Sequence, residues 1–143
     1  MNDELWLIDS NILVYGFDSS DERQKKAGQL IEECTRGKRK LAISLQNLTE
    51  LFYGLTRKVP QKLTPSEAAK IITLFIEHNN WIKLIPKETT LLAAMKFVSE
   101  RKVQFWDAMI AAVMLENNIH KIITEDQGFA QIPGIVVKNP FVK

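Results

Sequence analysis

The sequence is poor in the side chains that build disulfides and zinc sites. It has one cysteine, Cys34, and two histidines, His78 and His120. A single cysteine excludes an intrachain disulfide, and so few Cys and His residues argue against a Cys/His zinc site. Any metal ion bound by this chain is therefore expected to be held by oxygen ligands.

Long apolar runs are also missing. The longest, Ala108 to Leu115, ends at Glu116, well short of the roughly 18 to 20 residues that cross a bilayer. The stretch from Met1 to Asp9 contains no Lys or Arg and so lacks the basic start of a secretory signal, which predicts a cytoplasmic location. With 143 residues, of which 45% are hydrophobic, we expect one domain spanning 1–143.

A strong net charge is absent, because the formal charge at pH 7 is only +2. The basic residues are nevertheless uneven in their distribution, since four of them fall within positions 36–40: Arg36, Lys38, Arg39 and Lys40. This patch is typical of a solvated turn between a helix and a strand, and it is also compatible with contact to a phosphate backbone.

Short apolar runs alternate with amphipathic stretches along the whole chain. The apolar runs predict strands at Leu5–Ile8, Leu41–Ser44, Trp81–Ile85, Lys121–Thr124 and Ile135–Val137. The stretches with apolar residues every three or four positions predict helices at Glu22–Arg36, Gln46–Lys58, Pro65–His78, Glu88–Glu100 and Phe105–Glu116, with a loop or short helix over Asn11–Gly16. This order predicts an α/β fold with a mostly parallel sheet covered on both faces.

Four acidic residues fall where such a sheet collects reactive groups. Asp9 and Asp126 each follow a predicted strand, Glu50 lies one turn into the helix after the second strand, and Asp107 lies in the first turn of the most apolar helix. In an open parallel sheet, these positions meet in the crevice at the carboxyl ends of the strands. We therefore expect the four carboxylates to share one site.

Carboxylates at close range repel one another, so such a cluster needs a cation. Mg²⁺ and Mn²⁺ prefer oxygen ligands, and this ligand set is typical of phosphodiester hydrolases. Taken singly, Asp9 and Asp107 also fit helix-capping or helix-dipole roles, and Asp126 fits a turn through Gly128. Glu50 is the most informative of the four, because it lies among apolar residues of its helix.

Four segments of the chain resemble the acidic motifs of PIN domains, in the same order. They are Leu-Ile-Asp-Ser-Asn-Ile-Leu at 7–13, Asn-Leu-Thr-Glu-Leu at 47–51, Phe-Trp-Asp-Ala-Met-Ile-Ala-Ala at 105–112 and Ile-Thr-Glu-Asp-Gln-Gly-Phe at 123–129. The closing segment at 135–141 is similar to the last strand of many VapC-type toxin ribonucleases. The resemblance covers essentially the whole chain.

The resemblance implies a three-layer α/β/α fold and a metal-dependent endoribonuclease with Asp9, Glu50, Asp107 and Asp126 as its Mg²⁺ or Mn²⁺ ligands. It also implies that Ser10, Asn11 and Thr124 support that site. A homodimer and, for a toxin, a small antitoxin that inserts into the active-site groove are further implications. A housekeeping RNA-processing nuclease and a non-catalytic RNA- or protein-binding module remain as alternatives.

Two other α/β families fit less well. A phosphate-receiver domain needs a pair of acids at the end of the first strand, where this chain has one. A haloacid-type phosphatase needs Asp-x-Asp there, whereas the sequence reads Asp9-Ser10-Asn11. The absence of a His, Ser or Cys constellation favours attack on single-stranded RNA by a metal-bound water, which leaves a 5′-phosphate and a 3′-hydroxyl.

Two expectations concern surfaces. Arg36, Lys38, Arg39, Arg57 and Lys58 are candidates for contact with the RNA backbone, although a purely solvated role suits each of them as well. The helices at Gln46–Lys58 and Pro65–His78 are expected to pack as a pair, with Phe52, Tyr53 and Leu55 between them. Such a pair is expected to form a two-fold interface.

Overall fold

The structure is a computed structural model that describes residues 4–142. The expected single domain reaches from 1 to 143, so residues 1–3 and 143 lie outside the described part. Within it the elements follow the chain in this order: β1 (Trp6–Ile8), α1 (Ser10–Tyr15), α2 (Gln24–Thr35), β2 (Leu41–Ser44), α3 (Leu45–Arg57), α4 (Pro65–Glu77), β3 (Trp81–Leu84), α5 (Glu88–Glu100), α6 (Phe105–Glu116), β4 (Lys121–Ile123), the 3₁₀ helix η1 (Gln127–Gln131) and β5 (Val136–Lys138).

The predicted elements are all present, with ends shifted by a residue or two. The segment after β1, expected as a loop or short helix, is helix α1. The Asp21 carboxylate accepts hydrogen bonds from Arg23 in a turn that precedes the start of α2 at Gln24. Gly37 follows the end of α2 in a left-handed conformation with φ of 77°.

The strands form a parallel sheet in the order β3-β2-β1-β4-β5. Trp6 pairs with Leu41 on one side and with Lys121 on the other, so β1 lies in the middle of the sheet. Because all the strands run in the same direction, their carboxyl ends meet at one edge. This confirms the predicted parallel α/β fold.

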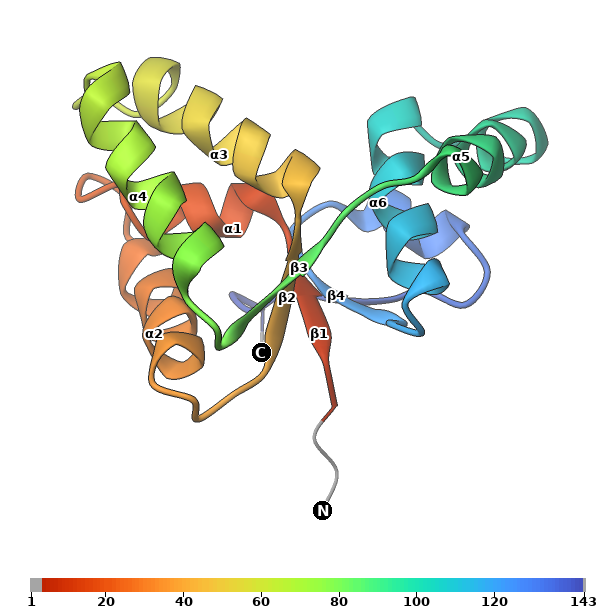
Figure 1. Ribbon diagram of the computed structural model, residues 1–143, viewed down its shortest axis with the longest axis horizontal. Helices are drawn as coiled ribbons and strands as arrows, with labels where there is room; N and C mark the ends of the chain where they lie inside the picture. The colour runs from red at the N-terminus through yellow and green to blue at the C-terminus, as the bar shows by residue number, and fades with distance from the viewer. Residues whose placement is uncertain (1–3, 143) are drawn as a thin grey trace.

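Helices cover both faces of the sheet (Figure 1). On one face, Ile8 and Ile43 pack in a core with side chains of α1, α2, α3 and α4. On the other face, Leu7 and Ala42 pack against α6 and η1, and α5 covers the outside of α6. Neighbouring strand residues face opposite sides, which explains why the strands are apolar at successive positions. The result is a three-layer α/β/α arrangement.

The predicted helix pair α3 and α4 is present, but one of its side chains lies elsewhere. Phe52 borders a shallow groove between the two helices, and Leu55 is fully buried. Tyr53 does not lie between them: its side chain is 52% exposed and faces the groove between α3 and α1. Successive helical residues point about 100° apart, so Phe52 and Tyr53 cannot both face α4.

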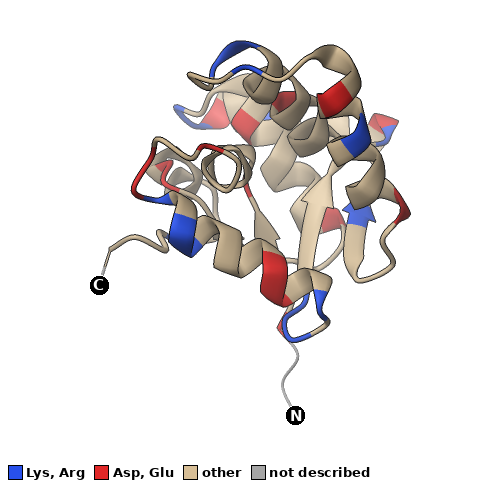
Figure 2. Cartoon of the chain, turned by 90° about the vertical axis from the view of Figure 1, so that its left-hand side faces the viewer, with Lys and Arg blue, Asp and Glu red and all other residues tan. Residues whose placement is uncertain are grey.

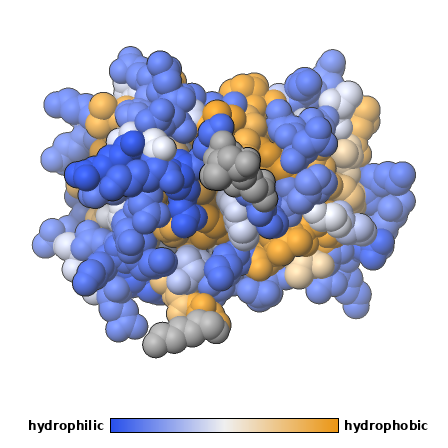
Figure 3. All heavy atoms as spheres, turned by 90° about the horizontal axis from the view of Figure 1, so that it is seen from below, coloured by the Kyte–Doolittle hydropathy of each residue, from blue (hydrophilic) through white to orange (hydrophobic). Residues whose placement is uncertain are grey.

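Helix α5 carries a second exposed apolar surface. Leu91, Leu92, Met95 and Val98 are exposed along it. Figure 3, which views the molecule from below, shows further hydrophobic atoms at the surface of the right-hand half of that face. None of the helices in residues 4–142 combines the length and apolar character needed to cross a membrane.

Candidate active site

Asp9 lies at the carboxyl end of the central strand. Its backbone N–H donates to the carbonyl of Ile123 at 2.9 Å, which continues the pairing of β1 with β4. Its Oδ1 then accepts the N–H of Ser10 at 2.8 Å and caps α1. Only 6% of Asp9 is exposed. Asp9 therefore caps α1 and is also one of the buried acids of the site.

Thr124, at the end of the neighbouring strand, joins two of the acids. Its hydroxyl donates to Asp9 Oδ2 at 2.7 Å and accepts the backbone N–H of Asp126 at 3.0 Å. Asn11 Nδ2 also points at this hydroxyl, at 3.4 Å. Thr124 is fully buried, so these contacts fix Asp9 relative to the segment that carries Asp126.

Glu50 lies on α3, the helix that directly follows β2 at the carboxyl edge of the sheet. Its Oε1 accepts the hydroxyl of Ser10 at 2.9 Å, which ties α3 to the start of α1. Gln46, one turn earlier, donates to Glu50 Oε2 at 3.4 Å and to the backbone carbonyl of Trp106 at 3.1 Å. These contacts hold α3 against the start of α6, where Asp107 lies.

Asp107 and Asp126 meet beside Gly128. A Cβ built on Gly128 would lie 3.0 Å from Asp126 Oδ1 and 3.6 Å from Asp107 Oδ2, so a larger residue would intrude between the two carboxylates. Burial, a hydrogen bond with Asp126 and the charges of Asp126, Asp9 and Glu50 together raise the pKa of Asp107 to about 7. The charges of all three other acids therefore contribute to the raised pKa of Asp107.

Asp9 is affected in the same way. Burial raises its pKa to about 6, against hydrogen bonds from Thr124 and Ser10 that lower it, and the charges of Glu50 and Asp126 add to the rise. The structure thus brings the four predicted acids to one edge of the sheet, where the neighbouring charges add to the rise in the pKa of Asp9 and Asp107. It also places all three predicted supporting residues, Ser10, Asn11 and Thr124, at their side.

Asn47 is a further site residue that we did not predict. It is fully buried, and its Nδ2 donates to Asp9 Oδ1 at 3.3 Å. Its Oδ1 accepts the backbone N–H of Ser44 at 3.0 Å, while its own N–H donates to the Ser44 hydroxyl at 3.0 Å. This reciprocal cap starts α3 and ties it to β1. The signal in the sequence was Ser44 three residues before Asn47, a spacing typical of a helix start.

A second unpredicted group lies beside the acids. Arg23 packs 3.9 Å from the ring centroid of Tyr15 and forms an ion pair with Glu125 at 3.1 Å. The Tyr15 hydroxyl donates to the same carboxylate at 2.5 Å, and burial together with Glu125 raises the pKa of Tyr15 to about 12. Glu125, which adjoins Asp126, is therefore paired with a cation outside the acid cluster, since neighbouring residues of an extended segment point to opposite sides.

The basic patch before β2 lies away from the acids. Residues 36–40 precede β2, whereas the acids follow the carboxyl ends of the strands, so the patch is at the opposite edge of the sheet (Figure 2). Arg36 pairs with Glu32 at 3.6 Å and Arg39 with Glu33 at 3.1 Å. The structure does not bring Arg36, Lys38 or Arg39 to the acid cluster.

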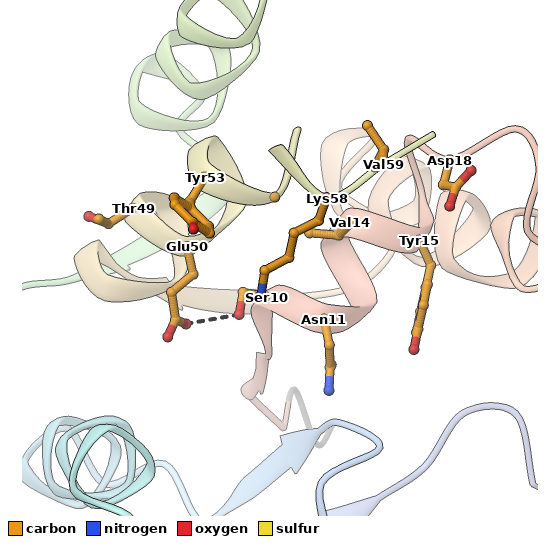
Figure 4. A pocket seen from close by; sticks show the side chains of 11 residues that line it. Ser10, Asn11, Val14, Tyr15, Asp18, Thr49, Glu50, Tyr53, Lys58 and Val59 are labelled. Atoms are coloured by element: carbon orange, nitrogen blue, oxygen red, sulfur yellow. Dashed lines mark hydrogen bonds between the residues drawn. The ribbon is translucent and has the colours of Figure 1, made fainter. Parts of the chain in front are cut away.

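The other two basic candidates lie at the end of α3, near a groove. The groove runs between α1 and α3, has a volume of about 630 Å³ and begins at Ser10 and Glu50 (Figure 4). Lys58 lines it together with Tyr53, and the guanidinium of Arg57 lies 5.6 Å from the Tyr53 ring centroid.

A comparison with protein-family models agrees with this geometry. The model described as the PIN domain matches residues 6–135, which include all four acids. The chain belongs to the PIN domain family. A comparison with curated proteins finds no significant match.

Solved structures with the same fold include several toxins. VapC20 of Mycobacterium tuberculosis, described as a sarcin-ricin loop cleaving toxin, is 17% identical, with a TM-score of 0.68 over 89% of this chain and 93% of that one. VapBC2 of Rickettsia felis, bound to a promoter DNA fragment, is 18% identical, with a TM-score of 0.67 over 94% and 98% of the two chains. A toxin-antitoxin complex from Klebsiella pneumoniae is 23% identical, with a TM-score of 0.64 over 95% and 98%.

The donor set of this PIN domain fits a hard divalent cation. All the candidate ligands are carboxylate oxygens, and their mutual repulsion is relieved by a cation. Gly128 leaves space between Asp107 and Asp126, and Asn11 Oδ1 is buried without a hydrogen-bond partner. Among residues 4–142, no three acidic, His or Cys side chains are already close enough to hold an ion, so some of these carboxylates would turn toward it on binding.

The first prediction concerns Asn47. Asn47→Ala removes the donor to Asp9 and half of the α3 cap, so we expect it to lower the free energy of unfolding by about 2 kcal/mol and to lower nuclease activity as well. Thr64→Ala breaks a similar cap at the start of α4, far from the acids, and should cost about 1 kcal/mol with activity kept. Urea unfolding and RNA cleavage by both variants test this, and equal activities would contradict the role of Asn47 in placing Asp9.

The second prediction follows from the raised pKa of Asp9. In the unfolded chain this pKa is 3.8, and folding raises it to about 6. The folded state therefore binds the proton more tightly, and the resulting stability is fully present below about pH 4 and is lost as the pH rises through about 6. Asp107, with its pKa raised to about 7, acts in the same direction over a wider range.

Asp9→Asn keeps the shape of the side chain and removes its charge. With divalent metal chelated, the variant should match the parent in stability near pH 4 and exceed it by up to about 3 kcal/mol at pH 8. Denaturant unfolding across this pH range measures the difference, and a difference independent of pH would show that Asp9 is ionised without penalty.

Proposed function

We propose that this PIN domain is a divalent-metal-dependent endoribonuclease that hydrolyses single-stranded RNA, and that it is the toxin of a toxin–antitoxin pair. The observation that carries the proposal is the meeting of Asp9, Glu50, Asp107 and Asp126 at one edge of the sheet, where burial and mutual repulsion raise the pKa of Asp9 and Asp107. A group of acids held together at such a cost is typical of a cation site.

Each acid has a defined support in this proposal. Asp9 is held rigidly by Ser10, Asn47 and Thr124, so its carboxylate is already oriented before a ligand arrives. Glu50 is directed by the Ser10 hydroxyl.

Asp107 and Asp126 share a hydrogen bond, and a bound cation would favour the ionised form of both carboxyls. The four carboxylates would hold Mg²⁺ or Mn²⁺, which supplies a counter-charge to the scissile phosphate and lowers the pKa of water.

The reaction we propose is attack by water in line with the leaving oxygen, which leaves a 5′-phosphate and a 3′-hydroxyl. No side-chain nucleophile is required, and the Ser10 hydroxyl is committed to Glu50. A housekeeping RNA-processing nuclease and a non-catalytic binding module on the same fold are the alternatives. Retention of all four acids supports catalysis, and the toxins among the similar structures support the toxin role.

The third prediction concerns metal and products. A chelator should abolish RNA cleavage, and Mg²⁺ or Mn²⁺ should restore it. Asp107→Asn should lower the rate by at least about 100-fold, because loss of a mere support for a metal ligand already costs about 10- to 100-fold. Glu100→Gln, an exposed acid at the end of α5, is the matched control and should cleave like the parent.

Product ends separate this mechanism from its main competitor. Labelling of 5′-phosphates should detect every new end. A cyclic 2′,3′-phosphate formed without metal would mean that the 2′-hydroxyl of the RNA is the nucleophile, and the proposed chemistry would be wrong.

A homodimer and a small antitoxin are the proposed protein partners. The dimer surface we propose is the outer face of α3 and α4, where Leu45 is 46% and Ile76 is 49% exposed beside the groove that Phe52 borders. Burying such a surface across a two-fold axis removes apolar area from water. The antitoxin proposal is supported by the toxin-antitoxin complexes among the similar structures.

The fourth prediction tests the dimer surface. Ile76→Glu places a charge on the α3–α4 face and should convert a dimer into a monomer at micromolar concentration, as measured by light scattering. Leu92→Glu makes the same change on α5, where the side chain is 63% exposed, and should leave the mass unchanged. Loss of the dimer in Leu92→Glu alone would move the interface to α5, and a monomeric parent would refute the homodimer.

A further inference from the structure

The groove between α1 and α3 continues from the acid cluster. One end is formed by Ser10 and Glu50, which hydrogen-bond to each other at 2.9 Å. From there it extends along both helices toward Val59 and Asp18, as Figure 4 shows. A polymer whose reacting bond lies at the acids would therefore have its neighbouring unit in this groove.

The charge in the groove is asymmetric. Lys58 is the one cation among the described residues that line it, and Figure 4 shows its side chain running back toward Ser10 and Glu50. Asp18 lies at the far end, where its Oδ1 accepts the N–H and the hydroxyl of Ser20 and is thus turned to its own loop. A phosphate near the acid cluster would meet the Lys58 ammonium first.

Two tyrosines form the walls. Tyr53 is 52% exposed on the α3 side, with Arg57 and Lys58 each 5.6 Å from its ring centroid. Tyr15, on the α1 side, is fixed by Arg23 at 3.9 Å. An exposed aromatic ring beside a cation is the combination that binds single-stranded nucleic acid, since the ring stacks a base and the cation tracks the backbone.

Helices α1 and α3 come close together at the floor of the groove. A Cβ on Gly54 would lie 2.8 Å from Val14 Cγ2, so α1 and α3 come together at its floor. A floor of backbone and aliphatic side chain, with polar groups at the rim, suits one flat base better than a helix of another protein.

We propose that this groove is a nucleotide subsite, in which Tyr53 stacks the base adjacent to the scissile phosphate of single-stranded RNA and Lys58 binds a backbone phosphate. The proposal rests on the proposed ribonuclease function and adds where the RNA lies. It requires an unstacked base, so the subsite discriminates against duplex RNA.

The test measures binding in an Asp107→Asn background with Mg²⁺, so that the probe survives. The probe is a fluorescein-labelled single-stranded RNA pool of random sequence, about 10 nucleotides long, followed by anisotropy. Lys58→Gln should weaken binding about 5-fold and lower the slope of log affinity against log salt by about 0.7, as expected for one phosphate of a single strand.

Tyr53→Leu should weaken binding by about 5- to 100-fold without changing the salt slope, because stacking carries no charge. Tyr53→Phe keeps the ring and should bind like the parent. Lys96→Gln, an exposed lysine on α5 across the sheet, is the control for general electrostatics and should change little. The same pool annealed to its complement should bind at least about 10-fold more weakly than the single strands.

Four other results would contradict the proposed nucleotide subsite. Unchanged affinity in Lys58→Gln and Tyr53→Leu, with the active parent still cutting RNA, overturns the subsite and leaves the ribonuclease function standing. Equal losses in Lys96→Gln and Lys58→Gln mean diffuse attraction. A loss of dimer mass in Tyr53→Leu with RNA affinity kept means that the groove is a protein interface. A parent that neither binds nor cuts RNA removes both proposals together.

Discussion

Repulsion among four carboxylates is the constraint on which the functional edge of this PIN domain depends. Asp9 is buried and yet surrounded by Glu50 and Asp126, and its pKa rises to about 6 despite hydrogen bonds that favour its ionised form. The protein keeps the group assembled through neutral donors: Thr124, Ser10 and Asn47 all reach Asp9. These contacts orient the carboxylates without neutralising them, so their negative charge stays available to a cation.

The same reasoning explains why Glu125 is kept apart. It adjoins Asp126 in the sequence, and a fifth free carboxylate would add to the repulsion. Arg23 and the Tyr15 hydroxyl bind it instead, which removes its charge from the cluster and anchors the segment after β4 to α1 and to the start of α2. Arginine suits this task because it stays ionised and can contact a ring and a carboxylate together. Arg23 therefore stabilises the fold at Glu125. Among the described residues, no Lys or Arg forms an ion pair with the four site acids.

Sequence reasoning predicted the fold, and the position of the four acids at one edge of the sheet, because both depend on local, repetitive signals. Strand ends next to Asp9 and Asp126 place those residues at one edge whatever the details of packing. The sequence did not predict the roles of Asn47, Tyr15 and Arg23. These roles depend on contacts between segments far apart in the chain, such as that of Tyr15 with Glu125. Tyr53 was assigned to the wrong side of α3 because apolar spacing gives the buried stripe of a helix, whereas an aromatic at its border can face either neighbour. The basic residues at 36–40 show a related limit, because composition revealed the patch and only topology placed it opposite the acids.

The geometry links binding to assembly through a single helix. Helix α3 begins with the Ser44–Asn47 cap that supports Asp9, presents Glu50 one turn later, and ends at Lys58 beside the groove. Its opposite face borders α4 through Phe52. A partner that shifted α3 relative to α1 would move Glu50 away from Ser10 and change the groove at the same time, because Gly54 and Val14 leave no spare room between the helices. Close packing of this kind transmits small displacements, so a protein bound on the α3–α4 face is expected to shift both the acid cluster and the groove even when it leaves the acids uncovered.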